Sequence, residues 1–108
     1  MAEVSLYEQD VLRAASQNLP WQLLDGKNVL VTGATGLIGG AVADVLMAAP
    51  TSCRVFASGR NQQRAEKRFA RYAQSARFRF LPMDLTQPLE GDTDFHFVID
   101  AAGGAAPR

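Results

Sequence analysis

The sequence predicts an α/β fold with a parallel sheet and helices packed on its faces. Two observations carry this prediction. Short apolar segments of strand type alternate with segments of helical periodicity over residues 28–100. In addition, the first strand-to-helix junction holds Gly33, Gly36 and Gly39 in the spacing G-x-x-G-x-x-G. Strands that alternate with helices form parallel sheets with right-handed crossovers, so the winding of the chain is predicted as well.

A helix at residues 5–18 is predicted to precede this unit. Ser5 and Glu8 form a capping box at its start. Its partly apolar side consists of Leu6, Val11, Leu12, Ala15 and Leu19. We expect residues 1–25 to form a helical leader that packs as a cap on one side of the sheet, and residues 26–108 to form the α/β domain.

The elements of the domain follow in chain order. We expect strands at residues 28–32, 54–58, 78–82 and 95–100, and helices at residues 37–48 and 62–75. Pro50 ends the first of these helices, and Asn61 can cap the second. The second helix is expected to bury Ala65, Phe69, Tyr72 and Ala73. With the strand order 3-2-1-4, the ligand crevice lies between the first and fourth strands, where the winding reverses.

The glycine-rich turn between the first strand and its helix is typical of a phosphate-binding site. Gly33 can take the backbone angles of a tight turn, and Gly39 lets the helix pack closely on its strand. Gly36 has no side chain to keep a pyrophosphate from the free amides of Leu37 and Ile38. A P-loop is excluded because no Gly-Lys-Ser/Thr closes the motif. We therefore predict dinucleotide binding, with an ordinary strand–helix turn as the alternative.

Composition limits the class of protein. The 108 residues suit one domain or a piece of one, and 47% hydrophobic content with zero net charge argues against disorder. No apolar run approaches the ~20 residues of a membrane span, and the N-terminus has no signal-peptide pattern. The single cysteine, Cys53, cannot form an internal disulfide and is expected as a small residue at a strand entrance. We expect a cytoplasmic protein without a metal site.

The segment from Arg54 to Arg79 is strongly basic, with Glu66 as its only acid. Nucleic-acid binding would require aromatic side chains or a docking motif among the basic residues. Phe69 and Tyr72 fall instead on the apolar side of the predicted helix. We therefore expect a solvated helix face and no nucleic-acid partner.

The segment Val31-Thr32-Gly33-Ala34-Thr35-Gly36-Leu37-Ile38-Gly39 resembles the nucleotide-binding signature of the extended short-chain dehydrogenase/reductases, the NAD-dependent epimerase/dehydratase group. The resemblance covers about residues 22–107 and implies the N-terminal half of a Rossmann fold, with Thr35 among the cofactor-binding residues. It implies a parent enzyme that oxidises a hydroxyl of a nucleotide sugar by hydride transfer and then epimerises, dehydrates or decarboxylates it. The alternative is a non-catalytic module that senses a dinucleotide with the same turn.

Gly59 and Arg60 favour NADP over NAD as the cofactor. In NAD-binding relatives an acidic residue near the end of the second strand binds both ribose hydroxyls and repels a 2′-phosphate. Gly59 stands at about that place and carries no carboxylate, whereas Arg60 offers paired donors to a phosphate dianion. The alternative for Arg60 is an exposed side chain that leads into the helix.

The resemblance implies further cofactor contacts after the third and fourth strands. Asp84 matches the residue that accepts a hydrogen bond from the adenine amino group, and Leu85 would flank the ring. Ala101, Ala102 and Gly103 match the small residues that lie against the diphosphate and ribose.

Two polar residues of the fourth strand fit this pattern less well. Asp100 stands where relatives often have His or Asn, which leaves its role open. His96 lies between two phenylalanines and is expected as a packed or edge residue rather than a catalytic one.

The residues that would carry catalysis are not expected in this chain. Family members place Tyr-x-x-x-Lys on a later helix, where the lysine lowers the pKa of the tyrosine. Tyr7 and Tyr72 are followed at the fourth position by Val11 and Ala76. We expect a truncated chain, inactive on its own, that self-associates through the uncovered edge of its fourth strand. A complete protein with a structural role is disfavoured, because it would leave that edge open.

Overall fold

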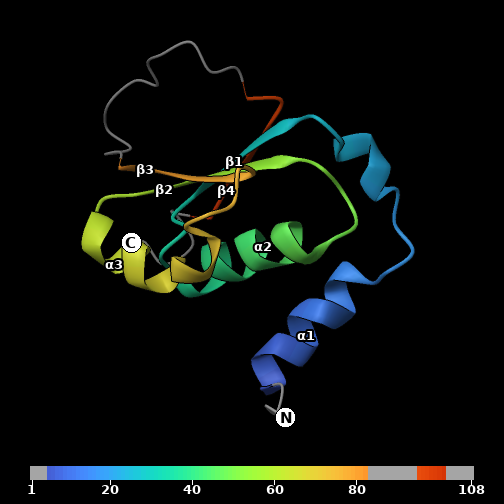
Figure 1. Ribbon diagram of the computed structural model, residues 1–108, viewed down its shortest axis with the longest axis horizontal. Helices are drawn as coiled ribbons and strands as arrows, with labels where there is room; N and C mark the ends of the chain where they lie inside the picture. The colour runs from blue at the N-terminus through green and yellow to red at the C-terminus, as the bar shows by residue number, and fades with distance from the viewer. Residues whose placement is uncertain (1–4, 83–94, 102–108) are drawn as a thin grey trace, which may run out of the picture.

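The computed structural model describes residues 5–82 and 95–101 and shows a four-stranded parallel sheet with helices on one face (Figure 1). The strands are β1 (Asn28–Thr32), β2 (Arg54–Gly59), β3 (Phe78–Pro82) and β4 (Phe97–Asp100), in the order β3-β2-β1-β4. The helices α2 (Leu37–Ala48) and α3 (Gln62–Arg68) follow β1 and β2. The predicted α/β class and strand order are confirmed.

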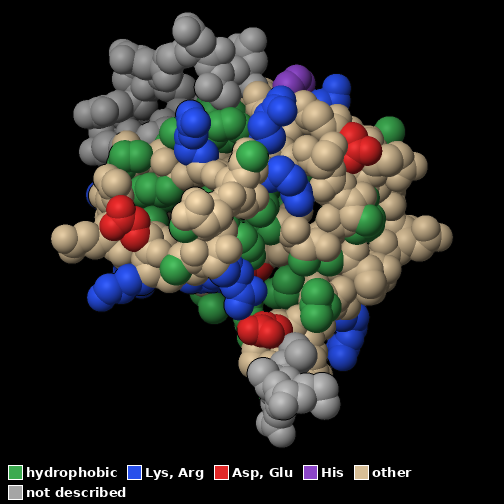
Figure 2. Space-filling view, viewed as in Figure 1, with side chains coloured by type: hydrophobic (Ala, Val, Ile, Leu, Met, Phe, Trp, Pro, Cys, Tyr) green, Lys and Arg blue, Asp and Glu red, His purple; other side chains and the backbone are tan. Residues whose placement is uncertain are grey.

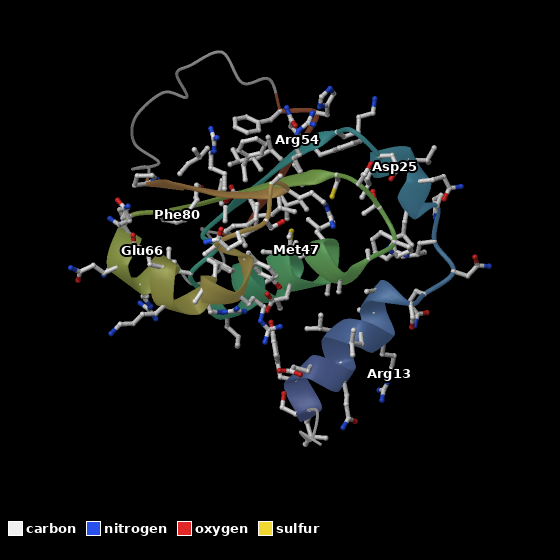
Figure 3. The ribbon with its side chains drawn as sticks, viewed as in Figure 1. Arg13, Asp25, Met47, Arg54, Glu66 and Phe80 are labelled. Carbon is white, nitrogen blue, oxygen red and sulfur yellow. The ribbon has the colours of Figure 1, made fainter. Side chains whose placement is uncertain are left out.

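The core lies between the sheet and these two helices. Val29 of β1 stands opposite Val55 of β2, and both are buried. Since side chains alternate along a strand, every second residue of the inner strands faces the helices. Burial of an aliphatic side chain of this size stabilises a fold by about 1.5–3 kcal/mol. Met47 of α2 and Phe80 of β3 pack against this core, whereas Glu66 points away from it (Figure 3).

The leader forms the helix α1 (Leu6–Ala15) and the 3₁₀ turn η1 (Trp21–Leu24). The Ser5 hydroxyl accepts a hydrogen bond from the Glu8 amide, as the capping box predicts. The helix ends three residues before the predicted boundary, because the Ser16 hydroxyl and the side-chain amide of Gln17 donate to the carbonyl of Arg13.

The leader lies on one side of the sheet as expected, with Trp21 and Leu24 packed against the core, but the contacts of α1 differ from the expectation. The helix α1 packs on α2, and so lies one layer away from the sheet (Figure 1). Its predicted apolar side is mostly exposed, since Leu6 and Leu12 are 78% and 54% exposed and only Ala15 is buried. Besides Ala15 and the half-buried Val11, polar contacts therefore contribute to holding α1.

The second helix of the domain is shorter than predicted. The helix α3 stops at Arg68, and the 3₁₀ turn η2 (Ala70–Tyr72) replaces its expected last turns. Side chains three residues apart eclipse in a 3₁₀ turn. This geometry stacks the rings of Phe69 and Tyr72 at 6.3 Å and places both against Phe78. Ala65 and Phe69 are buried as predicted, but Ala73 is exposed.

The fourth strand begins two residues later than predicted. The ring of Phe95 packs edge-on against Phe56 at 5.2 Å, outside the regular ladder. His96 Nδ1 accepts from the amide of Asn28, so this histidine pairs at the strand edge as expected. Cys53, directly before β2, is fully buried. Over the described residues, no helix has the length and apolar character that would let it cross a membrane.

Candidate functional site

The glycine turn after β1 is closed by the backbone. Gly33 has φ of 63°, in the left-handed region that favours glycine. Its carbonyl accepts from the Gly36 amide at 3.0 Å, and the Ala34 amide donates to the carbonyl of Ser58 at 3.0 Å. The turn is thereby tied to the carboxyl end of β2.

Gly39 is required by a close approach of backbone to backbone. A Cβ atom at this position would lie 2.3 Å from the Gly33 carbonyl oxygen and 2.9 Å from the Ala34 Cα. Neither atom belongs to a side chain that could move aside. The first turn of α2 therefore packs directly on the glycine turn, as the motif predicts.

The N-terminus of α2 is open to an anion. Gly36 is the N-cap, in the extended conformation, and no side chain caps the helix there. Leu37 and Ile38 follow at 87% and 65% exposure, so the first residues of α2 lie at the surface. Uncapped amides and the helix dipole together favour a phosphate group. A Cβ at Gly36 would lie 3.3 Å from the Gly33 carbonyl oxygen, so the fold itself nearly admits a side chain there.

The carboxyl end of β2 adjoins this turn. The Thr35 hydroxyl lies 3.5 Å from where a Cβ of Gly59 would be, which brings two predicted site residues together. Arg60 follows, exposed, and makes no hydrogen bond or ion pair within the described part of the chain. Figure 2 shows the basic side chains in separate groups over the viewed face, interrupted by polar and apolar surface.

The carboxyl end of β4 lies beside that of β1, on the other flank of the turn. The Ala101 amide donates to the Thr32 carbonyl at 3.3 Å. The Thr32 hydroxyl donates to Asp100 Oδ1 at 2.7 Å, a contact that the sequence did not reveal. The remaining predicted site residues, Asp84, Leu85, Ala102 and Gly103, lie outside the described residues.

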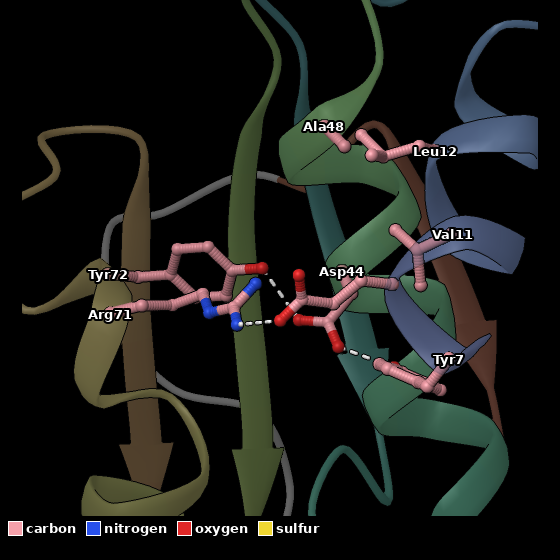
Figure 4. A pocket seen from close by; sticks show the side chains of 8 residues that line it. Tyr7, Val11, Leu12, Asp44, Ala48, Arg71 and Tyr72 are labelled. Atoms are coloured by element: carbon pink, nitrogen blue, oxygen red, sulfur yellow. Dashed lines mark hydrogen bonds and ion pairs between the residues drawn. The ribbon is translucent and has the colours of Figure 1, made fainter. Parts of the chain in front are cut away.

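A buried carboxylate in α2 is the main feature that sequence reasoning missed. Asp44, with a side chain only 3% exposed, accepts hydrogen bonds from Tyr7, Arg68 and Tyr72. Tyr7 and Tyr72 approach it from two sides, beside a cavity of about 100 Å³ (Figure 4). Burial would raise the pKa of Asp44, but these hydrogen bonds outweigh it and hold the pKa below its usual value. The one signal was an acidic residue within the apolar helix pattern.

Neither tyrosine is suited to act as a general base. Burial, together with the hydrogen bond to Asp44, raises the pKa of both Tyr7 and Tyr72 above the usual value for a phenol. A catalytic tyrosine needs the opposite shift, because the phenol must exchange its proton near neutral pH. Within the described residues, no cluster of His, Cys, Asp and Glu has the composition of a metal site.

Residues 29–108, most of the chain, match the model of the NAD dependent epimerase/dehydratase family. The chain belongs to this family. The resemblance drawn from the glycine motif is thereby confirmed, and the family implies a dinucleotide cofactor. No curated protein and no solved structure matches the chain. The exposed, uncapped end of α2 and the space left by Gly36 fit such a cofactor.

Proposed function

We propose that this chain binds the cofactor of an epimerase/dehydratase-type oxidoreductase, with the pyrophosphate on the N-terminus of α2. One observation carries the proposal: α2 begins at Gly36 without a side-chain cap, and its first residues are exposed. Gly33 and Gly39 hold this end of the helix against the sheet. The amides of Leu37 and Ile38 would donate to the phosphate oxygens.

The cofactor that we propose is NADP. Gly59 offers no carboxylate to repel a 2′-phosphate, and the hydroxyl of Thr35 lies 3.5 Å from where its Cβ would be. Arg60 is exposed beside that place, with its guanidinium available to a phosphate group. Asp84 and Leu85 would flank the adenine. Ala101, Ala102 and Gly103 would line the diphosphate and ribose.

The reaction that we propose belongs to a longer protein acting on a nucleotide sugar. The bound nicotinamide supplies hydride transfer, and a Tyr-x-x-x-Lys pair outside these residues would move the proton. The residues of this chain bind and orient the cofactor. The raised pKa values of Tyr7 and Tyr72 support this division of roles.

We propose that this chain self-associates through the outer edge of β4. This strand stands at one end of the sheet, and no strand of the described residues pairs with its outer edge. Phe97 and Val98 are 46% and 56% exposed there. An apolar edge with unpaired backbone groups is a template for a second chain.

Calorimetry with Gly36→Val tests the proposed function. We expect measurable NADP binding by the unaltered chain and none by the variant, because the branched side chain would fill the pyrophosphate position. Gly36 has φ of −81° and ψ of 175°, which valine adopts readily, so the fold should survive. Ala73→Val is the matched control, since it introduces the same branched side chain at an exposed position directly after η2. Equal NADP affinity in Gly36→Val would refute the assignment.

A further inference from the structure

The carboxylate of Asp44 joins three elements that are far apart in the sequence. Tyr72 of η2 donates to its Oδ1 at 2.6 Å. Arg68 of α3 donates to its Oδ2 at 2.7 Å, and Tyr7 of α1 donates to the same oxygen. We call these four residues the Asp44 cluster. Because the carboxylate is buried, each of these charge-assisted hydrogen bonds is stronger than a neutral one at the surface.

The Asp44 cluster reaches the phosphate-binding end of α2 through Gly40. Gly40 follows Gly39 directly and lies one turn before Asp44, on the same side of the helix. The guanidinium of Arg68 lies over it, so that a Cβ at Gly40 would be 2.7 Å from Arg68 Nη2. The missing side chain of Gly40 is what lets Arg68 reach Asp44.

The same cluster also fixes the ribose side of the proposed site. The helix α3 begins two residues after Arg60 and ends at Arg68. Within the described residues, the hydrogen bonds that join α3 to α2 run through Arg68 and Asp44. The cluster therefore sets the position of the helix after Arg60 relative to the helix whose amides would hold the pyrophosphate.

The leader completes this arrangement by a polar contact. The Tyr7 hydroxyl, which donates to Asp44, also accepts a hydrogen bond from Arg68 at 3.0 Å. The guanidinium of Arg68 lies 5.8 Å from the centre of the Tyr7 ring. Another polar tie of α1 to this region, Arg71 to Glu8 at 3.3 Å, is exposed and contributes little. The leucines of α1 are mostly exposed, and the hydroxyl of Tyr7 ties α1 to both α2 and α3.

We propose that α1 is a positioning element of the dinucleotide site, acting through Tyr7 and the Asp44 cluster to fix the spacing between the pyrophosphate and ribose sides. The inference rests on the proposed function. Its consequence is specific: a ligand that spans both sides depends on α1, and a ligand held on one side does not.

The test compares NADP with 2′-AMP in the unaltered chain and in Tyr7→Phe, by calorimetry and by titration of amide signals. We expect Tyr7→Phe to bind NADP about threefold to thirtyfold more weakly. The affinity for 2′-AMP, which needs only the ribose side, should stay unchanged. Leu12→Ala is the matched control, because Leu12 lines the same cavity of α1 but makes no hydrogen bond to Asp44.

Three results would overturn the proposal. In the first, NADP affinity is the same in Tyr7→Phe and the unaltered chain. In the second, the affinities for NADP and 2′-AMP fall equally, as for a merely structural role. In the third, the unaltered chain binds neither ligand, and the proposed function falls with it. Circular dichroism checks the fold of each variant. If Tyr7→Phe unfolds, the same comparison of NADP with 2′-AMP is made with Arg68→Lys. This variant keeps the positive charge but loses the paired donors of the guanidinium.

Discussion

Replacing Asp44 by asparagine should strongly destabilise the fold at neutral pH. The substitution keeps the volume of the side chain but removes the charge and one acceptor oxygen. Arg68, with a side chain 32% exposed, then loses its carboxylate partner, and at least one of the tyrosine hydroxyls loses its acceptor. Hydrogen bonds to charged groups contribute about 1.5–3 kcal/mol each, so we expect a loss of about 2–4 kcal/mol. That is a large share of the ~5–15 kcal/mol that stabilises a typical domain.

Urea unfolding of the two proteins at pH 7 measures this loss. A loss of that size should lower the midpoint by about 1–3 M urea, given the usual slope for a small domain. Asp10→Asn is the matched control, because Asp10 is 73% exposed and pairs with Arg13 only at 3.8 Å. The control should change the free energy of unfolding by less than about 0.5 kcal/mol.

The pH dependence gives an independent check. The folded-state pKa of Asp44 is lower than in the unfolded chain, so its stabilising effect is full above an unfolded value of about 3.9. The effect is lost as the pH falls through the lowered folded value. The difference in stability between the unaltered chain and Asp44→Asn should therefore shrink steadily below about pH 4. A constant difference from pH 7 to pH 2, or no difference at pH 7, would refute this reasoning.

Three further outcomes follow from the same geometry. Gly39→Ala should abolish cooperative folding or cost more than about 3 kcal/mol in urea unfolding, because its Cβ would meet the Gly33 carbonyl oxygen at 2.3 Å; stability equal to that of the unaltered chain would contradict the close approach. Arg60→Ala should weaken NADP binding roughly 10- to 150-fold in calorimetry and leave NAD unchanged, since one charge-assisted contact to the 2′-phosphate is lost. A preference for NAD in the unaltered chain would show Arg60 to be only a solvated side chain. Val98→Lys should reduce self-association in sedimentation, because a charge on an edge strand opposes pairing; a monomeric unaltered chain would exclude this interface.

The sheet and the glycine turn could be predicted because their signals are local. Short β-branched and apolar runs indicate the strands, and the dinucleotide-binding fold that the glycine motif indicates supplies their order. Gly33 and Gly39 have one physical reason each, a left-handed φ and a close backbone approach, and the structure shows both.

The position of the leader and the end of α3 could not be predicted because distant contacts decide them. Leu6 and Leu12 suggest an apolar contact face but are mostly exposed, whereas Tyr7 joins α1 to α2 through a partner 37 positions away. In the same way, Tyr72 turns the chain out of the helix to reach Asp44, 28 residues earlier. A single acid in an apolar helix does not show which donors will surround it. Thr32 and Asp100, 68 residues apart, present the same difficulty in the site.

Titration of the chain with NADP, followed through its backbone amide signals, tests the central claim most directly. The account predicts that the largest changes fall on Leu37, Ile38 and Gly39, because the amides of the first turn of α2 would donate to the pyrophosphate. Smaller changes should appear at Gly59 and Arg60. No change at the start of α2, or changes confined to residues away from the carboxyl ends of the strands, would contradict it.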